Sequence, residues 1–120
     1  MKFVLTEEQQ ALAEAVDEII ESAGGTKPAR TWAAGDTASG RALWAQLAEL
    51  GLLGLCVSEE NGGMGGTAVD LAVAFERLGY HAVPGPFIES AALLPDLVDD
   101  DARSGIVDGS IIATASVTGL

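Results

Sequence analysis

Mostly apolar residues recur every three or four positions in four stretches of the chain, which is the periodicity of an α-helix. The spacing predicts helices at about 6–23, 40–50, 67–79 and 85–95. The positions on the four faces are Leu12, Ala15, Val16, Ile19 and Ala23; Leu43, Trp44, Leu47 and Leu50; Leu71, Ala74, Phe75 and Leu78; and Phe87, Ser90, Ala91 and Leu94. A mostly helical domain follows from this pattern.

The ends of the first three predicted helices carry the residues that helix termini favour. Thr6 opens the first helix and Thr67 the third, each followed three residues later by a side chain that completes a capping pattern, Gln9 and Asp70. Gly24-Gly25 ends the first helix, because glycine adopts the left-handed conformation common after a helix. For the same reason Gly51 and Gly79 are expected to end the second and third helices.

Proline marks both ends of the fourth predicted helix. Pro86 stands at its first position, where a missing N–H costs nothing. Pro95 is expected to end or bend it, because proline cannot continue the hydrogen-bond ladder.

The connecting stretches are predicted to be irregular. Residues 26–40 are expected to form a loop with one short turn, with Trp32 anchoring it on the core. Residues 52–57 are expected to be buried and mostly extended, and 58–66 to form a glycine-rich loop. Residues 96–109 are expected to form an acidic connector.

Residues 110–117 are short and rich in β-branched side chains, which predicts a strand. One strand cannot form a sheet by itself, so its partners are expected beyond Leu120. The chain is therefore interpreted as an N-terminal piece of a longer protein, with a helical domain at 1–107 and the start of a β domain at 108–120.

Charge narrows the classes of partner. The chain has 120 residues and a formal net charge of −12, with a pI near 4.1. No basic stripe exists to contact a phosphate backbone or an anionic membrane surface, so nucleic acid and membrane partners are not expected.

There is no secretory signal and no apolar run of the roughly 18 residues that span a bilayer, and a cytoplasmic location is expected. Hydrophobic residues make up 48% of the chain, so it is expected to fold and to bury some apolar surface against a further partner.

The residues that commonly carry site chemistry do not assemble into an active site. Cys56 stands in an apolar run and is expected to be buried and inert. His81 has no second histidine or cysteine to share a metal, so no metal site is expected. The glycine loop at 62–66 lacks both the dinucleotide fingerprint and a phosphate-binding lysine. The runs at 59–60 and 99–101 are interpreted as solvated carboxylates.

Four segments, in this order, resemble the N-terminal helical domain of the acyl-CoA dehydrogenase family. They are Phe3–Gln9, the stretch Trp44–Leu55 that reads WAQLAELGLLGL, the loop Val57–Gly66 that reads VSEENGGMGG, and Glu76–Gly79. Ser58 stands where proline is usual in that loop. Residues 83–87, VPGPF, are closest in type to the smaller actinobacterial members.

The resemblance implies a three-part protein with this helical domain, a middle β domain and a C-terminal helix bundle. Such enzymes use FAD to remove two hydrogens from the α and β carbons of an acyl-CoA, with a carboxylate as base. The base is expected beyond Leu120, and no catalytic or flavin-binding residue is assigned here. FAD is expected to be bound mainly by regions beyond this chain, so the 120 residues alone are expected to be inactive. The implied partners are acyl-CoA, the remaining domains of the protein, a homo- or hetero-tetramer and an electron-transfer flavoprotein.

The resemblance also assigns one wall of the acyl pocket to this domain. The start of the helix after the segment at 76–79 would lie beside the acyl chain, which nominates Pro86, Phe87 and Ser90, with Glu89 as a weaker candidate. Phe87 is the main candidate, because a large rigid ring limits the depth of an apolar pocket.

Two other classes of function remain open at this point. The chain is also compatible with a relative that uses the same fold differently, such as a non-catalytic partner subunit, an oxidase or a flavin monooxygenase. The second alternative is a free-standing acidic helical module that closes its own core and acts by binding. The carboxylate base of a C-terminal bundle and the behaviour of the isolated chain distinguish these alternatives.

Overall fold

The computed structural model describes residues 4–116, which form helices joined by short turns. The α-helices are α1 (Glu7–Ser22), α2 (Lys27–Ala33), α3 (Ala38–Leu50), α4 (Ala68–Tyr80) and α5 (Asp100–Asp108). The 3₁₀ turns are η1 (Leu52–Gly54), η2 (Glu59–Asn61) and η4 (Leu94–Asp96), and the π-helix is η3 (Ile88–Leu93). The mostly helical fold class is confirmed.

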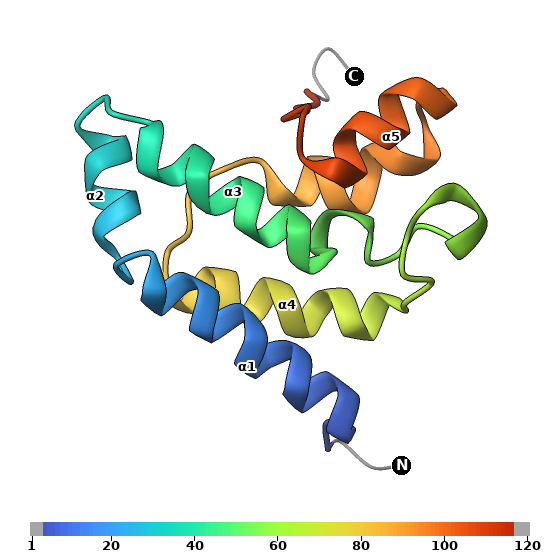
Figure 1. Cartoon of the computed structure of the whole chain (residues 1–120), viewed down its shortest axis with the longest axis horizontal. Coiled ribbons are helices and arrows are strands. Elements are labelled where there is room, and N and C mark those ends of the chain that lie inside the picture. Colours follow the sequence, from blue (N-terminus) through green and yellow to red (C-terminus); the bar gives the residue numbers. More distant parts are fainter. Residues whose placement is uncertain (1–3, 117–120) are drawn as a thin grey trace.

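Helix α3 lies between two groups of helices (Figure 1). Helix α1 runs beside α4 and also contacts α3, while α2 packs on the first part of α3. Helix α5 and the η3–η4 segment cover the other side of α3 and η1. The η3–η4 segment therefore lies against α5, η3 also contacts η1, and Phe87 directly before η3 packs on Trp44 of α3.

The core lies where α1, α3, α4 and η3 meet, as the four predicted faces require. Its largest fully buried side chains are Val16 and Ile20 of α1, Leu43 and Leu47 of α3, and Leu52 and Leu53 of η1. The other members of the buried cluster are Trp44, Ala48, Leu55, Leu71, Ala74, Leu78, Phe87 and Ala91. Burial of these side chains is the main source of stability in a fold of this size.

Both capping boxes form as predicted. The Thr6 hydroxyl accepts the Gln9 backbone N–H at 3.1 Å, and the Gln9 side chain accepts the Thr6 N–H at 3.0 Å. Thr67 and Asp70 do the same at the start of α4. Gly51 ends α3 in the left-handed conformation, with φ of 99°. Helix α4, however, runs one residue past the predicted end at Gly79.

Two stretches predicted to be irregular contain helices. Residues 27–33 form α2, with Pro28 in its first turn where proline is tolerated. Residues 100–108 form α5, because Asp99 caps it by accepting the Ala102 N–H at 2.8 Å. Acidic residues in the first turn also suit the positive end of a helix. The loop at 26–40 and the acidic connector at 96–109 were therefore wrong predictions.

Trp32 and the segment at 52–57 also differ from expectation. Trp32 lies on α2, half-buried against Gly40 of α3, and it stays outside the main core cluster. Residues 52–57 are buried apart from Cys56 but form consecutive tight turns instead of an extended segment. In these turns Leu55 donates to Leu52 O at 3.3 Å and Val57 to Gly54 O at 3.1 Å.

The fourth predicted helix forms with an altered geometry. The element is π-helical over 88–93 and changes to a 3₁₀ turn that contains Pro95. No strand forms in the described part of 110–117, and Val117 lies outside the described residues. A strand needs a neighbouring strand to bond with, and no other segment between residues 4 and 116 supplies one.

Candidate functional site

The residues nominated for the acyl pocket lie at the start of η3, directly against α3. Gly85 turns the chain with φ of 130°, a conformation that suits glycine alone, and Pro86 follows it. The Phe87 side chain is 6% exposed, and its ring centroid lies 4.4 Å from that of Trp44. Phe87 is thus a core residue as well as a candidate wall residue.

Pro86 and Phe87 line an open groove of about 370 Å³. The other residues around it are Phe75, Leu78 and Gly79 of α4, Ala82 and Val83 of the turn that follows, and Gly85, Ile88 and Glu89. Pro86 also borders a second cleft of about 540 Å³, together with Trp32, Arg41, Trp44 and residues of the 109–114 segment. The pair Pro86–Phe87 therefore stands beside apolar surface that an acyl chain could contact.

Ser90 lines neither hollow. Its side chain is fully buried, and its hydroxyl donates to Ala113 O at 2.6 Å and accepts the Ala113 N–H at 3.2 Å. Glu89 is half-buried at the rim of the groove that Phe87 lines. The structure thus places Pro86, Phe87 and Glu89 along one groove and turns Ser90 toward the segment that follows α5.

The glycine-rich loop packs closely on the chain before it. A Cβ at Gly63 would overlap the Val57 carbonyl, and a Cβ at Gly66 would lie 2.8 Å from Leu55 O. The loop therefore needs glycine for close backbone approach. The exposed carboxylates of Glu59 and Glu60 stand beside it. These charges would repel a phosphate, so the loop does not fit an anionic cofactor.

Cys56 is exposed, so the prediction that it is buried was wrong. It faces outward because Leu55 and Val57 on either side point into the core. Its thiol donates to Thr67 O at 3.3 Å. Partial burial, followed by the carboxylates of Asp70 and Asp96, raises the pKa of the Cys56 thiol. A thiol whose ionisation is disfavoured is a poor nucleophile at neutral pH.

A polar cluster between α1 and α4 is the feature that sequence reasoning missed. Asp17 Oδ1 accepts hydrogen bonds from Arg77 Nε at 2.7 Å and from His81 Nε2 at 2.9 Å. Partial burial raises the pKa of Asp17, but the hydrogen bonds from Arg77 and His81 outweigh it and hold the pKa below its ordinary value. Arg77 also lies over the Tyr80 ring, 4.5 Å from its centroid. The cluster ties α1 to α4.

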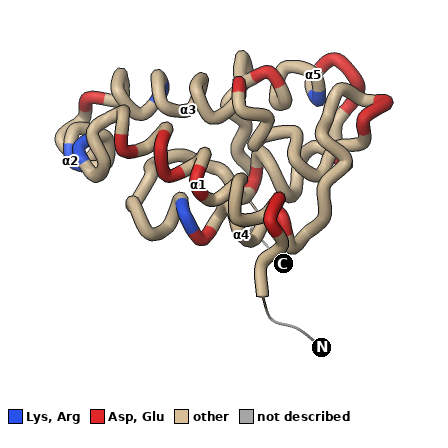
Figure 2. Tube along the Cα trace, turned by 60° about the horizontal axis from the view of Figure 1, so that its bottom comes forward, with Lys and Arg blue, Asp and Glu red and all other residues tan. Residues whose placement is uncertain are grey.

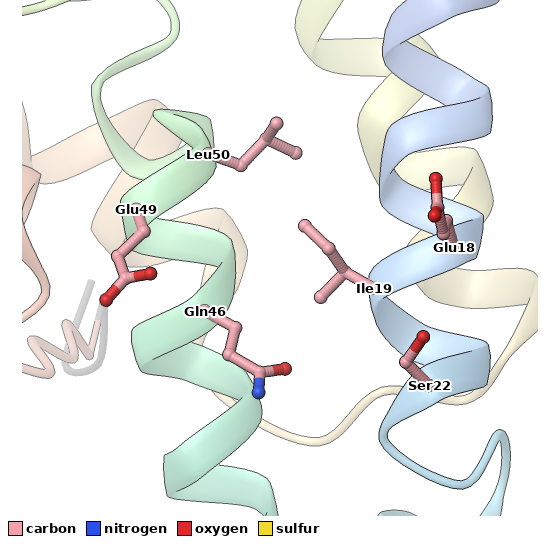
Figure 3. Close-up of a pocket in the computed structure, with 6 residues that line it drawn as sticks. All are labelled: Glu18, Ile19, Ser22, Gln46, Glu49 and Leu50. Atoms are coloured by element: carbon pink, nitrogen blue, oxygen red, sulfur yellow. The ribbon is translucent and has the colours of Figure 1, made fainter.

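A further groove of about 440 Å³ lies between α1 and α3 (Figure 3). Ile19 and Leu50 point toward each other across it, and Glu18, Ser22, Gln46 and Glu49 lie around them. Acidic residues follow α1 over its length, whereas basic residues gather at α2 (Figure 2). The surface of α1 therefore carries most of its charge as carboxylates.

Neither a metal-binding cluster nor a membrane-spanning helix is found in the part of the chain that the structure describes. Between residues 4 and 116, no group of three or more histidine, cysteine, aspartate or glutamate side chains is placed to hold a metal ion. None of the helices over the same residues combines the length and the apolar run that crossing a bilayer requires.

Comparison with known proteins identifies the family. Residues 6–95 match the family model described as acyl-CoA dehydrogenase, N-terminal domain. The acyl-CoA dehydrogenase IpdE2 of Mycobacterium tuberculosis is 33% identical over 112 residues, which cover 88% of this chain and 35% of that protein. The acyl-CoA dehydrogenase FadE34 of the same organism is 33% identical over 85 residues, 71% of this chain and 12% of that protein. IpdE2 of Mycolicibacterium smegmatis is also 33% identical, over 70% of this chain and 27% of that protein.

No solved structure matches the chain significantly. The chain spans about a third or less of the length of the curated relatives that it matches. The family match covers three quarters of the chain and includes α1 to α4 and the π-helix η3. This chain belongs to the acyl-CoA dehydrogenase family and contains its N-terminal helical domain.

Proposed function

We propose that the chain is the N-terminal part of a flavin-dependent acyl-CoA dehydrogenase that carries out α,β-dehydrogenation of an acyl-CoA thioester. The observation that carries this proposal is the family match over residues 6–95, supported by three mycobacterial relatives named as acyl-CoA dehydrogenases. Fatty and steroid side chains are the proposed acyl groups. The catalytic carboxylate would belong to a region beyond Leu120.

FAD is proposed as the cofactor, held mainly by other regions of the protein. The glycine-rich loop lacks the dinucleotide fingerprint, and its exposed Glu59 and Glu60 disfavour an anion there. This loop therefore does not fit the diphosphate of the flavin cofactor. The redox chemistry would be supplied outside this domain, and no step of it is assigned to a residue of this chain.

The share of this domain in the proposed reaction is to shape the acyl end of the pocket. Pro86 and Phe87 line an apolar groove, and the Phe87 ring is held in place by Trp44. A ring fixed in this way limits how far an apolar chain can extend, and it excludes water from the space beside it. Phe87 would therefore set the length or bulk of the acyl group that the enzyme accepts.

The proposed partners follow from the same family assignment. They are the acyl-CoA substrate, the remaining domains of the protein, further subunits of a homo- or hetero-tetramer, and an electron-transfer flavoprotein as acceptor. A cytoplasmic location is proposed with them.

The natural length of the protein, determined by intact mass and C-terminal sequencing, is the first test of the proposal. A chain that continues with a β domain and a helix bundle carrying a carboxylate agrees with a dehydrogenase. That protein should then oxidise acyl-CoA when a dye accepts the electrons. A natural chain that ended at Leu120 would lack the proposed catalytic carboxylate. That result would contradict the dehydrogenase proposal and favour a binding function. A full-length protein that retains flavin but lacks activity would instead indicate a non-catalytic partner subunit.

A further inference from the structure

Ser90 makes an unusual pair of hydrogen bonds for a serine within a helix. Its side chain is fully buried on η3, and the same hydroxyl donates to Ala113 O and accepts from Ala113 N. A serine within a helix commonly bonds a carbonyl one turn earlier in its own helix. Ser90 instead contacts a residue 23 positions further along the chain.

The hydroxyl acts at Ala113 as a residue of a neighbouring strand would. It satisfies both the N–H and the C=O of one residue in a segment that forms no strand between 110 and 116. Polar backbone groups that are removed from water cost free energy when they have no partner. The Ser90 hydroxyl therefore favours one fixed position for Ala113.

A second attachment holds the same segment to a different element. Ile111 donates its backbone N–H to Gly105 O at 3.0 Å, and its side chain packs on Gly105 of α5. Within residues 4–116, the bonds from Ser90 are the hydrogen bonds that join η3 to residues 110–116. Loss of the Ser90 hydroxyl would thus free Ala113 from η3 and leave Ile111 attached to α5.

The position of Ser90 links this attachment to the candidate acyl wall. Ser90 lies three residues after Phe87, and its backbone N–H donates to Pro86 O at 3.0 Å. The turns of η3 are of the wider π type, which are frequent at functional sites. Ser90 therefore connects Ala113, through its side chain, to Pro86, through its backbone N–H, and Phe87 lies between Pro86 and Ser90 in the chain.

We infer that Ser90 is a positioning residue that clamps the 110–116 segment to the wall formed by Pro86 and Phe87. The clamp fixes the position of this segment relative to the wall. The inference rests on the proposed function, in which that wall borders the acyl chain. Ser90 is not a substrate contact in this account, because its hydroxyl is fully buried and bonded to Ala113.

Hydrogen–deuterium exchange at natural length tests the clamp directly. With Ser90→Ala, the Ala113 amide should exchange at least about tenfold faster, since it loses its acceptor, while amides of α1 and α3 keep their protection. The matched control is Ser110→Ala, which removes a hydroxyl bonded to Gly105 O at 3.3 Å and should leave the Ala113 amide unchanged. Unchanged exchange at Ala113 in Ser90→Ala would overturn the inference.

A second variant covers the case in which Ser90→Ala does not fold. Ser90→Cys keeps a side chain of similar size but bonds more weakly, so the Ala113 amide should exchange faster than in the wild type, by a smaller factor than a full loss of the bond would give. Wild-type protection of Ala113 in Ser90→Cys would contradict the clamp.

Acyl-CoA kinetics separate a positioning role from a purely structural one. A displaced wall should raise KM for acyl-CoA about fivefold or more, while kcat stays within about twofold, because the reacting carbons lie outside this domain. Ser90→Cys should restore part of the change. Equal KM values in the wild type and Ser90→Ala would contradict a positioning role. If the wild type turns over no acyl-CoA, the proposed function fails, and the exchange experiment still decides whether the clamp exists.

Discussion

Trp44 of α3 and Phe87 at the start of η3 pack ring against ring, with centroids 4.4 Å apart and planes inclined by 34°. Such tilted aromatic pairs contribute more than their buried area alone. The contact joins α3 to the candidate acyl wall. Phe87 thus serves stability and, in the proposed function, selectivity at once.

Replacing Phe87 by alanine should therefore have two effects. The free energy of unfolding should fall by about 3–5 kcal/mol, as for other large core side chains. In the natural-length enzyme the range of accepted acyl chains should widen, measured as kcat/KM over a series of acyl-CoA lengths.

Ile20→Val is the control for that experiment. Ile20 is fully buried in α1, so the substitution should cost about 0.5–1.5 kcal/mol without changing acyl preference. An unchanged chain-length preference in Phe87→Ala would contradict the assigned role of the ring.

Thr67→Ala should destabilise the fold by about 1 kcal/mol, because it removes the N-cap of α4. Thr67 Oγ1 accepts the Asp70 N–H at 3.3 Å in the wild type. Thr26 precedes α2 without a side-chain cap bond, so Thr26→Ala should change stability by less than about 0.5 kcal/mol. Urea denaturation of both variants measures the difference, and equal losses would argue against the cap.

Stability should depend on pH through Asp17. A carboxyl with a lower pKa in the folded than in the unfolded state stabilises the fold above the unfolded pKa. That contribution is lost as the pH falls through the folded pKa. Asp17→Asn should therefore cost about 1–2 kcal/mol near neutral pH, and the wild type and variant should converge as the pH falls through the lowered pKa of Asp17.

Chemical denaturation across that pH range measures the effect of Asp17. Glu14→Gln is the control, since Glu14 is exposed on the same helix and its side chain makes no hydrogen bond or ion pair to any residue between 4 and 116. A constant difference between the wild type and Asp17→Asn at every pH would show that the carboxylate charge is not what Arg77 and His81 recognise.

Two glycine substitutions should have opposite signs. Gly63→Ala should destabilise the fold by about 2 kcal/mol or more, because the new Cβ overlaps the Val57 carbonyl. Gly79→Ala should stabilise it by about 0.5–1 kcal/mol, because it lies in α4 with no atom within 4 Å of the new Cβ. Thermal unfolding checks both, and a stabilising Gly63→Ala would contradict the close packing of the glycine loop.

Local signals in the sequence were sufficient for the long helices. The capping boxes at Thr6 and Thr67 and the apolar spacing of α1, α3 and α4 each involve residues within a few positions of one another. Helix α2 was not predicted because the glycines, the proline and the small polar residues of 26–40 indicated a loop, although Pro28 is permitted in the first turn of a helix. Helix α5 was not predicted because the run at 99–101 was interpreted as solvated carboxylates, whereas Asp99 is the N-cap of this helix.

Contacts between distant residues could not be predicted in the same way. His81 lies 64 positions after Asp17, and the two meet only because α1 packs on α4. Ser90 was nominated as a substrate contact by resemblance, and only its burial against Ala113 shows what its hydroxyl bonds. Cys56 turned outward because the chain makes tight turns at 52–57, which its apolar composition does not reveal.

Mixing the natural-length protein with acyl-CoA in the absence of oxygen tests the central claim most directly. We predict that the absorbance of oxidised flavin falls in proportion to the enzyme present, and that the thioester product is lighter by two hydrogens. A protein that binds flavin and acyl-CoA but leaves both unchanged would contradict the assignment as a dehydrogenase.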